Sequence, residues 1–345
     1  MDKKDFLSKQ VRHFDIKRTS CVNIVEQFKD MSFQARNLFN AASIYGDMLK
    51  DDDCTVILTL AGSIFSAGLK KVVYDMINYN MVDIIVSTGA IIVDQDFFEA
   101  LGHKHYIGSP DVDDKELLRN YIDRIYDTYI DEEELRDCDL TIKKIADKMP
   151  PGVYSSRQFI NYMGRYLEEN NLSGDSVVRI AYEKDVPIFV PAFSDCSAGF
   201  GLIFHQYERD KENLEKVSID SVKDFLELTK LKMASKETGL FMVSGGVPKN
   251  FAQDVTVACD ILEGKVNLHK YAIQITVADE RDGGLSGSTL KEAHSWGKVD
   301  IKRQQMVFAE ATIALPLIVS YVYEKGFYKK REMKCLNKEL EEVKR

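Results

Sequence analysis

The 345-residue chain lacks any uninterrupted apolar run that approaches the roughly 20 residues needed to cross a bilayer as a helix. Its first five residues contain acidic side chains and no apolar core, so we expect no signal peptide. An excess of basic residues is also missing: 46 Lys and Arg stand against 55 Asp and Glu, and the net charge of −9 argues against a nucleic-acid-binding surface. We therefore expect a cytoplasmic protein that binds neither membrane nor nucleic acid.

Paired cysteines are lacking too. The six cysteines form no CxxC pair and no ligand-like spacing with histidine, so we expect reduced thiols rather than disulfides or a zinc site. His103 and His105 are two residues apart but have no cluster of carboxylates nearby in the sequence, and such pairs are more often loop or strand-end residues than metal ligands. No metal site is predicted. The cysteines are Cys21, Cys54, Cys138, Cys196, Cys259 and Cys335.

What the chain does have is an alternation of apolar strands and helical patterns, within a length that allows one large α/β domain or two smaller ones. Residues 1–50 carry apolar side chains at three- and four-residue intervals, which predicts one or two amphipathic helices. From residue 55 onward, fully apolar strands that alternate with helices predict a parallel sheet covered on both faces. We expect strands at 55–60, 82–87, 186–191, 238–243, 271–277 and 306–308, and helices that include 117–129, 156–170, 177–183 and 219–235.

Each of the six expected strands ends in small or acidic residues. The carboxyl ends of parallel strands share one edge of a sheet, where glycine lets a backbone approach phosphates and a carboxylate can accept ribose hydroxyls. However, no G-x-G-x-x-G fingerprint follows any strand, and Gly199-Phe200-Gly201 lacks the third glycine. The pattern alone indicates an α/β enzyme that binds a ligand at the strand ends, and leaves open whether that ligand is a nucleotide. The clusters are 61–63, 88–90, 194–195, 245–246, 278–280 and 309–310.

The most distinctive stretch follows the strand at 271–277. A glycine-rich loop at 279–288 leads into a short helical pattern that ends on Ser295-Trp296-Gly297-Lys298, with the only tryptophan of the chain. An indole beside a lysine can supply an apolar wall and a nucleophilic amine, and Glu280, Asp282 and Glu292 can receive a cation. A solvated turn with a surface lysine is the commoner explanation of such a loop.

From about Asn23 to Gly326 the chain resembles the deoxyhypusine synthase family. The strongest match is residues 282–298, which are similar to the family segment that ends in E-A-x-S-W-G-K, whose final lysine is the catalytic nucleophile. Further matching blocks are 66–70, 82–89, 105–108, 191–195, 244–249 and 309–312.

This resemblance implies a Rossmann-like α/β fold, with a parallel sheet between helices on both faces, and an N-terminal helical extension. We expect a single domain over 1–345, with a helical segment at 1–50, an NAD-binding core at 51–325 and a charged, partly helical tail at 326–345. The resemblance also implies NAD as cofactor and a homotetramer with active sites at subunit interfaces.

The activity implied is the transfer of an aminobutyl group. Family enzymes oxidise an amine of spermidine by hydride transfer to NAD, the lysine attacks the imine, diaminopropane leaves, and the aminobutyl group passes to an acceptor amine before NADH returns the hydride. The acceptor is a lysine of a translation factor precursor in deoxyhypusine synthase, and putrescine in the homospermidine synthases of this family. A third hypothesis is a non-catalytic NAD-binding oligomer, although a retained Lys298 argues against it.

The resemblance also assigns roles to individual residues. Lys298 is the expected catalytic nucleophile, which an aromatic-lined, desolvated pocket would help to keep partly neutral. The expected substrate-binding residues are Glu292, Trp296, Asp282, Gly283, Gly284 and Asn250. The expected NAD contacts are Gly62, Ser63, Ser66, Thr88, Gly89, Ala90, Asp94, Asp195, Gly245, Val277, Ala278, Glu310 and Ala311.

Three positions depart from the family pattern. Asn250 stands where the family has a proton-handling histidine, and Phe200 and Leu285 stand where it has carboxylates that contact spermidine. Asparagine cannot shuttle a proton near neutral pH, so the sequence predicts a remodelled amine pocket beside an intact cofactor half. The candidates to compensate are Glu280, Asp282, Asp279 and His294.

Overall fold

A six-stranded, wholly parallel sheet organises the computed structural model, which describes residues 2–18, 20–172, 175–264 and 267–342. The strand order is β11-β10-β9-β1-β2-β7, so the chain extends the sheet from β1 first to one side and then to the other. The reversal falls between β1 and β9, the point at which doubly wound α/β folds bind ligands. The predicted fold class is confirmed. The strands are β1 (Cys54–Leu60), β2 (Ile84–Val86), β7 (Ile188–Phe189), β9 (Glu237–Val243), β10 (Tyr271–Thr276) and β11 (Gln304–Phe308).

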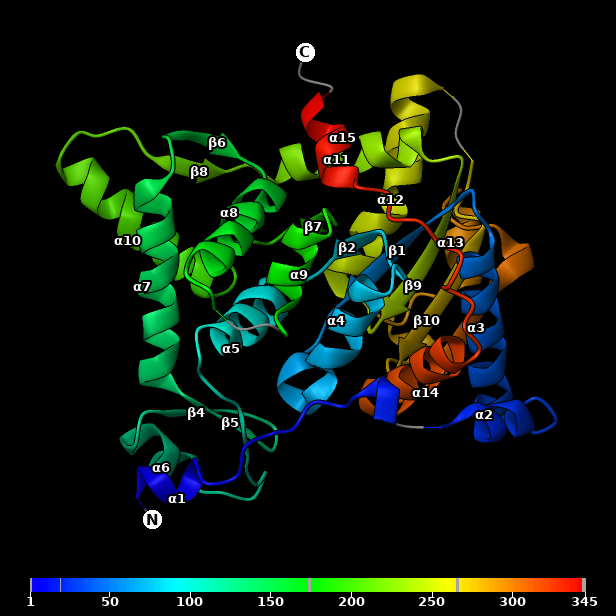
Figure 1. Cartoon of the computed structure of the whole chain (residues 1–345), viewed down its shortest axis with the longest axis horizontal. Helices are drawn as coiled ribbons and strands as arrows, with labels where there is room; N and C mark the ends of the chain where they lie inside the picture. Colours follow the sequence, from blue (N-terminus) through cyan, green and yellow to red (C-terminus); the bar gives the residue numbers. More distant parts are fainter. Residues whose placement is uncertain (1, 19, 173–174, 265–266, 343–345) are drawn as a thin grey trace.

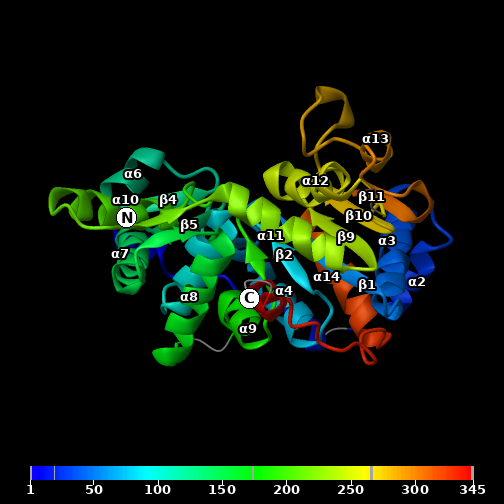
Figure 2. The same ribbon diagram turned by 90° about the horizontal axis from the view of Figure 1, so that it is seen from above.

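Helices cover both faces of this sheet, which explains why its strands are apolar throughout. Along β1, Val56 and Leu58 join one hydrophobic cluster and Ile57 joins the other, as the two-residue period of a strand requires. The helices α3 (Phe33–Lys50), α4 (Lys70–Asn78) and α14 (Ala311–Glu324) belong to the first cluster, and α11 (Ser221–Ala234) and α12 (Gly246–Glu263) to the second. Figure 2 shows α11 and α12 on one side of the sheet and α4 and α14 on the other.

The remaining helices and turns surround these layers (Figure 1). The predicted helices at 156–170 and 177–183 are confirmed as α8 (Ser156–Glu169) and α9 (Val177–Glu183), and Asp131 caps the helix that follows it. The other elements are α1 (Lys3–Phe6), η1 (Ile16–Arg18), α2 (Val22–Phe28), η2 (Phe65–Leu69), η3 (Ala90–Phe97), α5 (Phe98–Ala100), α7 (Glu132–Lys148), η4 (Glu280–Asp282), α13 (Leu290–Ser295), η5 (Ile301–Arg303) and α15 (Leu336–Glu342).

The prediction of a helix over 117–129 is wrong. The segment forms the end of α6 (Asp114–Arg119) and then an antiparallel hairpin of β4 (Ile122–Ile125) and β5 (Thr128–Asp131), with β3 (Tyr106–Ile107) on the other side of β5. Tyr126 takes a φ of 53° at the tip, which turns the chain back. The apolar spacing fits both structures, and the burial of Tyr129 against Phe6, with ring centroids 5.9 Å apart, accompanies the hairpin.

The sequence pattern also missed α10 (Ser197–Lys211) and the parallel pair β6 (Gly152–Tyr154) and β8 (Val217–Ile219). The helix α10 carries apolar side chains on its exposed face as well, among them Phe200 and Ile203, so the contrast between a polar and an apolar face is weak. Such a helix gives little periodic signal.

An N-terminal arm links the small sheet to the main body. After α1, the backbone of Gln10 pairs with Tyr106, Val11 N–H donates to the His105 carbonyl at 2.9 Å, and Phe14 N–H donates to the Gly68 carbonyl at 2.8 Å. The expected helical character of 1–50 is confirmed for α2 and α3, and residues 8–15 form this extended arm instead.

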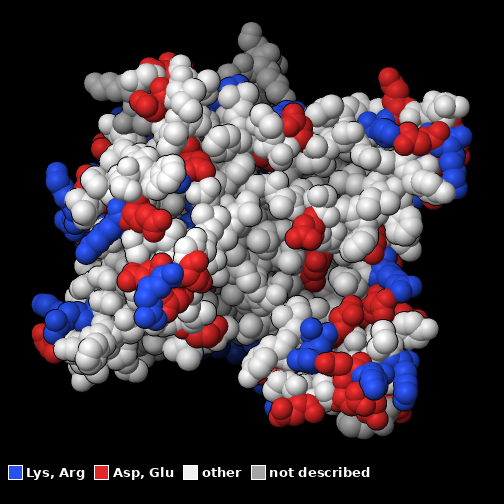
Figure 3. Space-filling view, turned by 180° about the vertical axis from the view of Figure 1, so that it is seen from behind, with Lys and Arg blue, Asp and Glu red and all other residues white. Residues whose placement is uncertain are grey.

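Three general features complete the fold. Each of the six cysteines is a free thiol. Over the part of the chain that the structure describes, no helix combines the length and the apolar character that crossing a bilayer requires. On the face opposite to that of Figure 1, most charged side chains lie toward the margins, and the hollowed middle is largely uncharged apart from a few acidic side chains (Figure 3).

A buried ion pair between α8 and α11 provides a test of this packing. Arg157 is 2% exposed, and it donates to the Glu227 carboxylate at 2.8 Å and to the side-chain Oδ1 of Asn337 at 2.8 Å. Replacing Arg157 with Met leaves a buried carboxylate without its cation, so we expect Arg157→Met to lower the free energy of unfolding by about 3–5 kcal/mol. Urea denaturation measures this loss.

The matched control lies on the same helix. Arg165 is exposed and pairs with Glu169 at 2.7 Å one turn away, so Arg165→Met should cost less than about 0.5 kcal/mol. Similar losses for the two variants would contradict the proposed importance of the buried pair.

Candidate functional site

The loops after β9 and β10 meet at the carboxyl edge of the sheet. A Cβ on Gly245 would lie 2.4 Å from the Cα of Ser286, so only glycine permits this approach of the two loops. Ser286 Oγ accepts a hydrogen bond from Gly246 N–H at 3.0 Å, and Gln274 Nε2 donates to the Ser286 carbonyl at 2.9 Å. The glycine-rich loop is therefore fixed to the start of α12.

Within this loop, most polar side chains form hydrogen bonds to other residues of the same loop. Asp279 accepts from the backbone and the side chain of Arg281, and Asp282 accepts from Gly284 N–H. Gly283 has a φ of +69°, the left-handed conformation that glycine adopts without strain. The loop ends on a capping box in which Thr289 Oγ1 accepts from Glu292 N–H at 3.1 Å and Glu292 accepts from Thr289 N–H at 3.3 Å.

The helix α13 that follows projects from the body beside α12 (Figure 2) and delivers the predicted nucleophile. His294 Nδ1 is 2.7 Å from the Val299 carbonyl, which closes the turn around Gly297. Lys298 is 9% exposed, and its Nζ lies 5.3 Å from the centroid of the Trp296 ring. The geometry thus places an amine beside an indole face, as a cation–π contact requires.

Two residues of α12 complete the surroundings of this amine. Lys298 Nζ is 2.6 Å from Asp254 Oδ1 and 3.1 Å from Asn250 Oδ1. Asn250 Nδ2 donates to Asp254 Oδ2 at 2.6 Å, so the three side chains form a closed ring of contacts. Sequence reasoning missed Asp254. Its spacing of four residues from Asn250, on one face of a helix, is the signal that could have found it.

The amine faces a cavity of about 820 Å³ between α11, α12 and α13. The predicted catalytic Lys298 lines this cavity, and so do the predicted substrate-binding residues Asn250, Gly283, Glu292 and Trp296, whereas Asp282 and Gly284 do not. Most of the wall is apolar, which the sequence did not reveal because it comes from two separate helices: Val222, Phe225 and Leu226 of α11, and Val257, Ala258, Ile261 and Leu262 of α12.

A second cavity of about 390 Å³ adjoins the first and extends to Pro191 and Val247 at the strand ends. Asn250, Asp254 and Leu285 line both cavities. The side chains that touch Lys298 therefore lie where the apolar cavity turns toward the edge of the sheet.

The departures from the family pattern fall in different places. Leu285 lines the cavity, so an apolar side chain stands there. Phe200 is 59% exposed on α10 and does not line it. Among the candidates to compensate, Glu280 and Asp279 are not part of the cavity wall, and His294 is engaged with the Val299 carbonyl.

Lys249 holds the glycine-rich loop from inside the protein. Its Nζ donates to the Leu285 carbonyl at 3.2 Å and to the carbonyl and hydroxyl of Ser288 at 2.5 and 2.9 Å. The side chain is fully buried, and burial lowers the pKa of Lys249 to about 8. The two lysines therefore have different environments. Lys249 points into the protein and fixes the glycine-rich loop, whereas Lys298 lines the cavity.

The predicted cofactor residues lie along the same edge of the sheet. Ser63, Ser66 and Glu310 line another cavity, of about 1450 Å³, together with the N-terminal arm and Lys71. Asp94 accepts from Ser197 N–H at 2.8 Å, and burial raises its pKa to about 7. The others follow the strands without lining this cavity: Gly62, Thr88, Gly89, Ala90, Asp195, Gly245, Val277, Ala278 and Ala311.

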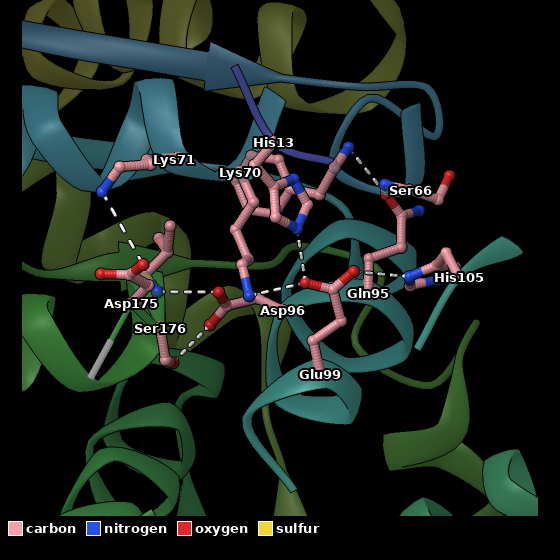
Figure 4. A network of polar contacts seen from close by, with 12 residues as sticks. His13, Ser66, Lys70, Lys71, Gln95, Asp96, Glu99, His105, Asp175 and Ser176 are labelled. Carbon is pink, nitrogen blue, oxygen red and sulfur yellow. Dashed lines mark hydrogen bonds and ion pairs between the residues drawn. The ribbon is translucent and has the colours of Figure 1, made fainter. Parts of the chain in front are cut away.

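A buried polar network fixes the loop after β1 (Figure 4). Gln95 Oε1 accepts from the N–H groups of Phe65 and Ser66, each at 3.0 Å. Nearby, Glu99 contacts Lys70 at 2.6 Å, His13 of the arm at 2.7 Å and His105 at 2.8 Å. Burial alone would raise the pKa of Glu99, but the hydrogen bonds to both histidines and the charge of Lys70 lower it well below its ordinary value.

A doubly wound sheet of this order, with glycine and acidic residues at its strand ends, defines a Rossmann-like α/β protein with a lysine-centred site at the carboxyl edge. A sequence profile of deoxyhypusine synthase matches residues 23–322. The chain belongs to the deoxyhypusine synthase family, whose members are transferases.

Similar proteins support the assignment. A deoxyhypusine synthase-like protein of Chlorobaculum tepidum is 61% identical over 338 residues, covering 98% of this chain and 96% of its own. A solved structure from Entamoeba histolytica, assigned to deoxyhypusine synthase, superposes with a TM-score of 0.59 at 20% identity over 91% of this chain and 97% of its own. The fold is also shared with AgrE in its ternary complex with ornithine and NAD⁺, at a TM-score of 0.54 and 12% identity over 85% of this chain and 34% of AgrE.

The role of Lys249 can be tested in the loop that it holds. Lys249→Met keeps the length of the side chain but leaves the Leu285 and Ser288 carbonyls without their donor, so the free energy of unfolding should fall by about 1–3 kcal/mol. Amide hydrogen exchange of residues 283–288 should accelerate. Lys291→Met, an exposed residue of α13, is the control, and unchanged exchange in Lys249→Met would contradict the role.

Asp94 gives a test by pH. Its pKa rises from 3.8 to about 7 on folding, so between these values the folded protein holds a proton that the unfolded chain releases, and stability falls as the pH rises. Asp94→Asn lacks this titration. Relative to the wild type, its free energy of unfolding without cofactor should improve by about 1–3 kcal/mol between pH 5 and pH 8. Parallel pH profiles from urea denaturation would contradict the assignment.

Proposed function

We propose that the protein is an NAD-dependent aminobutyltransferase of the deoxyhypusine synthase type. It transfers an aminobutyl group from a spermidine-like polyamine to an acceptor amine through an imine on Lys298. The observation that carries this proposal is the position of Lys298 Nζ, which faces an apolar cavity with Trp296 5.3 Å away and Asp254 2.6 Å away.

The residues at the strand ends fit a dinucleotide. The cavity of about 1450 Å³ beside Ser63, Ser66 and Glu310 is large enough for one. Ser63, Ser66 and Glu310 would hold it, with hydroxyls for phosphate and a carboxylate for ribose. When bound, NAD supplies the acceptor for the hydride that leaves the amine-bearing carbon.

The chain's own residues bind and orient the amine. Trp296 offers its ring face to an alkyl chain or an ammonium group, and Glu292 offers a carboxylate at the edge of the cavity. The apolar side chains of α11 and α12 form the wall against which the alkyl chain of the amine packs.

The acceptor is proposed to be a translation factor precursor, as in deoxyhypusine synthase. The alternative is a free diamine such as putrescine, as in homospermidine synthases. An apolar side chain in place of a carboxylate weakens the recognition of a polycation, so the donor or acceptor can differ from that of the family.

The active form is proposed to be a homotetramer in the cytoplasm. Val222, Ile261 and Trp296 are 73%, 77% and 67% exposed around the cavity, and a second copy of the chain that covers them would remove this apolar surface from water. Six free thiols fit a reducing compartment.

A trapping experiment tests the function. The protein is incubated with NAD and spermidine, reduced with borohydride and digested, and the expected result is added mass on Lys298. Lys298→Arg should show none, because a guanidinium is not nucleophilic, and turnover should fall roughly thousand-fold or more. Lys302→Arg, an exposed lysine of η5, serves as the control.

The same assay separates the alternatives. Transfer from the trapped intermediate to putrescine, but not to a translation factor precursor, favours the homospermidine type of activity. Tight NAD binding without an adduct from any polyamine would instead favour a non-catalytic NAD-binding oligomer and overturn the proposal.

A further inference from the structure

We infer that Asp254 is the proton carrier of the site, the group that accepts a proton from Lys298 and returns it to the amine that departs. This inference rests on the proposed function for the reaction in which the proton is transferred, whereas the contact between Asp254 and Lys298 is present in the structure itself. A carboxylate of α12 would thus carry out the proton transfer that the amide side chain of Asn250 cannot perform near neutral pH.

The geometry singles out this carboxylate. Asp254 Oδ1 lies 2.6 Å from Lys298 Nζ, within the reach that a general acid or base needs. Its second oxygen accepts from Asn250 Nδ2 at 2.6 Å, and Asn250 Oδ1 is 3.1 Å from the same Nζ. Asn250 therefore orients both partners, with its acceptor toward the lysine and its donor toward the carboxylate, and so acts as a positioning residue.

The other carboxylates and the histidine near the loop have different partners. Glu292 closes the capping box with Thr289, Asp279 pairs with Arg281, and Asp282 accepts from Gly284 N–H. His294 contacts the Val299 carbonyl. Among the described residues, Asp254 is the carboxylate that forms an ion pair with Lys298.

The groups around Asp254 permit this role. From the segments packed against it, Lys298 faces it directly, Glu292 lines the same cavity, and the charge of Lys249 interacts with those of Lys298 and Glu292. The side of α11 that faces the cavity contributes Val222, Phe225 and Leu226, which carry no charge. Asp254 also lines both adjoining cavities, so its carboxylate can meet the substrate nitrogen on either side of Lys298.

The step balances without any further reactant. Asp254 takes one proton from the Lys298 ammonium, and the neutral amine forms a bond to the iminium carbon of the substrate. In the resulting adduct the protonated Asp254 gives its proton to the substrate nitrogen and then accepts one from the positively charged lysine nitrogen. The bond between the carbon and the substrate nitrogen breaks, which leaves an iminium on Lys298, and the departing amine takes the proton from Asp254 and leaves as an ammonium ion. No electron is gained or lost overall.

The first assay measures imine formation without polyamine or NAD. Lys298 is exposed to butanal, an aldehyde that suits an apolar cavity, and the imine is trapped with borohydride over pH 5–9. We expect Asp254→Asn, which keeps the shape and a hydrogen bond, to slow trapping at Lys298 by about 10²-fold at pH 7. Asp260→Asn, an exposed carboxylate on the same helix, should trap at the wild-type rate.

The second variant restores a titrating group at a neighbouring position. Adding Asn250→His to Asp254→Asn should recover at least about tenfold of the lost rate, with a limb that rises through pH about 6.5 as an imidazole loses its proton. A purely structural role of Asp254 predicts no such pH dependence. NAD binding and thermal unfolding of each variant verify that the fold is retained.

The outcomes separate this inference from the proposed function. Asp254→Asn that traps butanal within threefold of the wild type overturns the inference, whatever happens with spermidine. So does a double variant that gains neither rate nor the new pH limb. A wild type that traps butanal in an Asp254-dependent manner, but never spermidine with NAD, supports the proton carrier and refutes the aminobutyl transfer.

Discussion

Parallel pairing of all six strands is the constraint on which the rest of the structure depends. Because β1, β2, β7, β9, β10 and β11 run in one direction, every turn that leaves a strand does so at the same edge. The reversal of winding between β1 and β9 separates the loops on its two sides. Segments far apart in the sequence, such as the ends of β1 and β11, thereby come to share one cavity. The site forms because the parallel sheet places the loops that follow its strands at one edge.

The second constraint is the fixation of the loop between β10 and α13. Lys249 ties it to α12 through the Leu285 and Ser288 carbonyls, and the approach of Gly245 to Ser286 leaves no space between the two loops. This fixed loop leads directly into α13, the helix that precedes Lys298. Preorganisation of this kind lowers the entropic cost of bringing side chains together at a site.

The site contains the lysine of the family motif, but its other charged groups differ from those that the family resemblance implies. Leu285 supplies an apolar wall where the family resemblance implies a carboxylate, and Asn250 replaces a histidine. In the structure a carboxylate stands one helical turn further along α12, at Asp254, in contact with Lys298. The carboxylate that pairs with Lys298 thus comes from α12 rather than from the glycine-rich loop. The rest of the cavity wall is mostly apolar and suits alkyl chains better than additional ammonium groups.

The sequence alone determined the six strands, their common edge, most of the helices and the pairing of Trp296 with Lys298, because these follow from short-range periodicity or from neighbouring positions in one motif. It did not determine the hairpin that ends at Asp131, the helix α10 or the contact between Asp254 and Lys298. The hairpin pattern fits a helix equally well until Phe6 packs against it. Asp254 meets Lys298 only because the tertiary fold lays α12 beside α13, and no local pattern encodes a distance between segments that far apart along the chain.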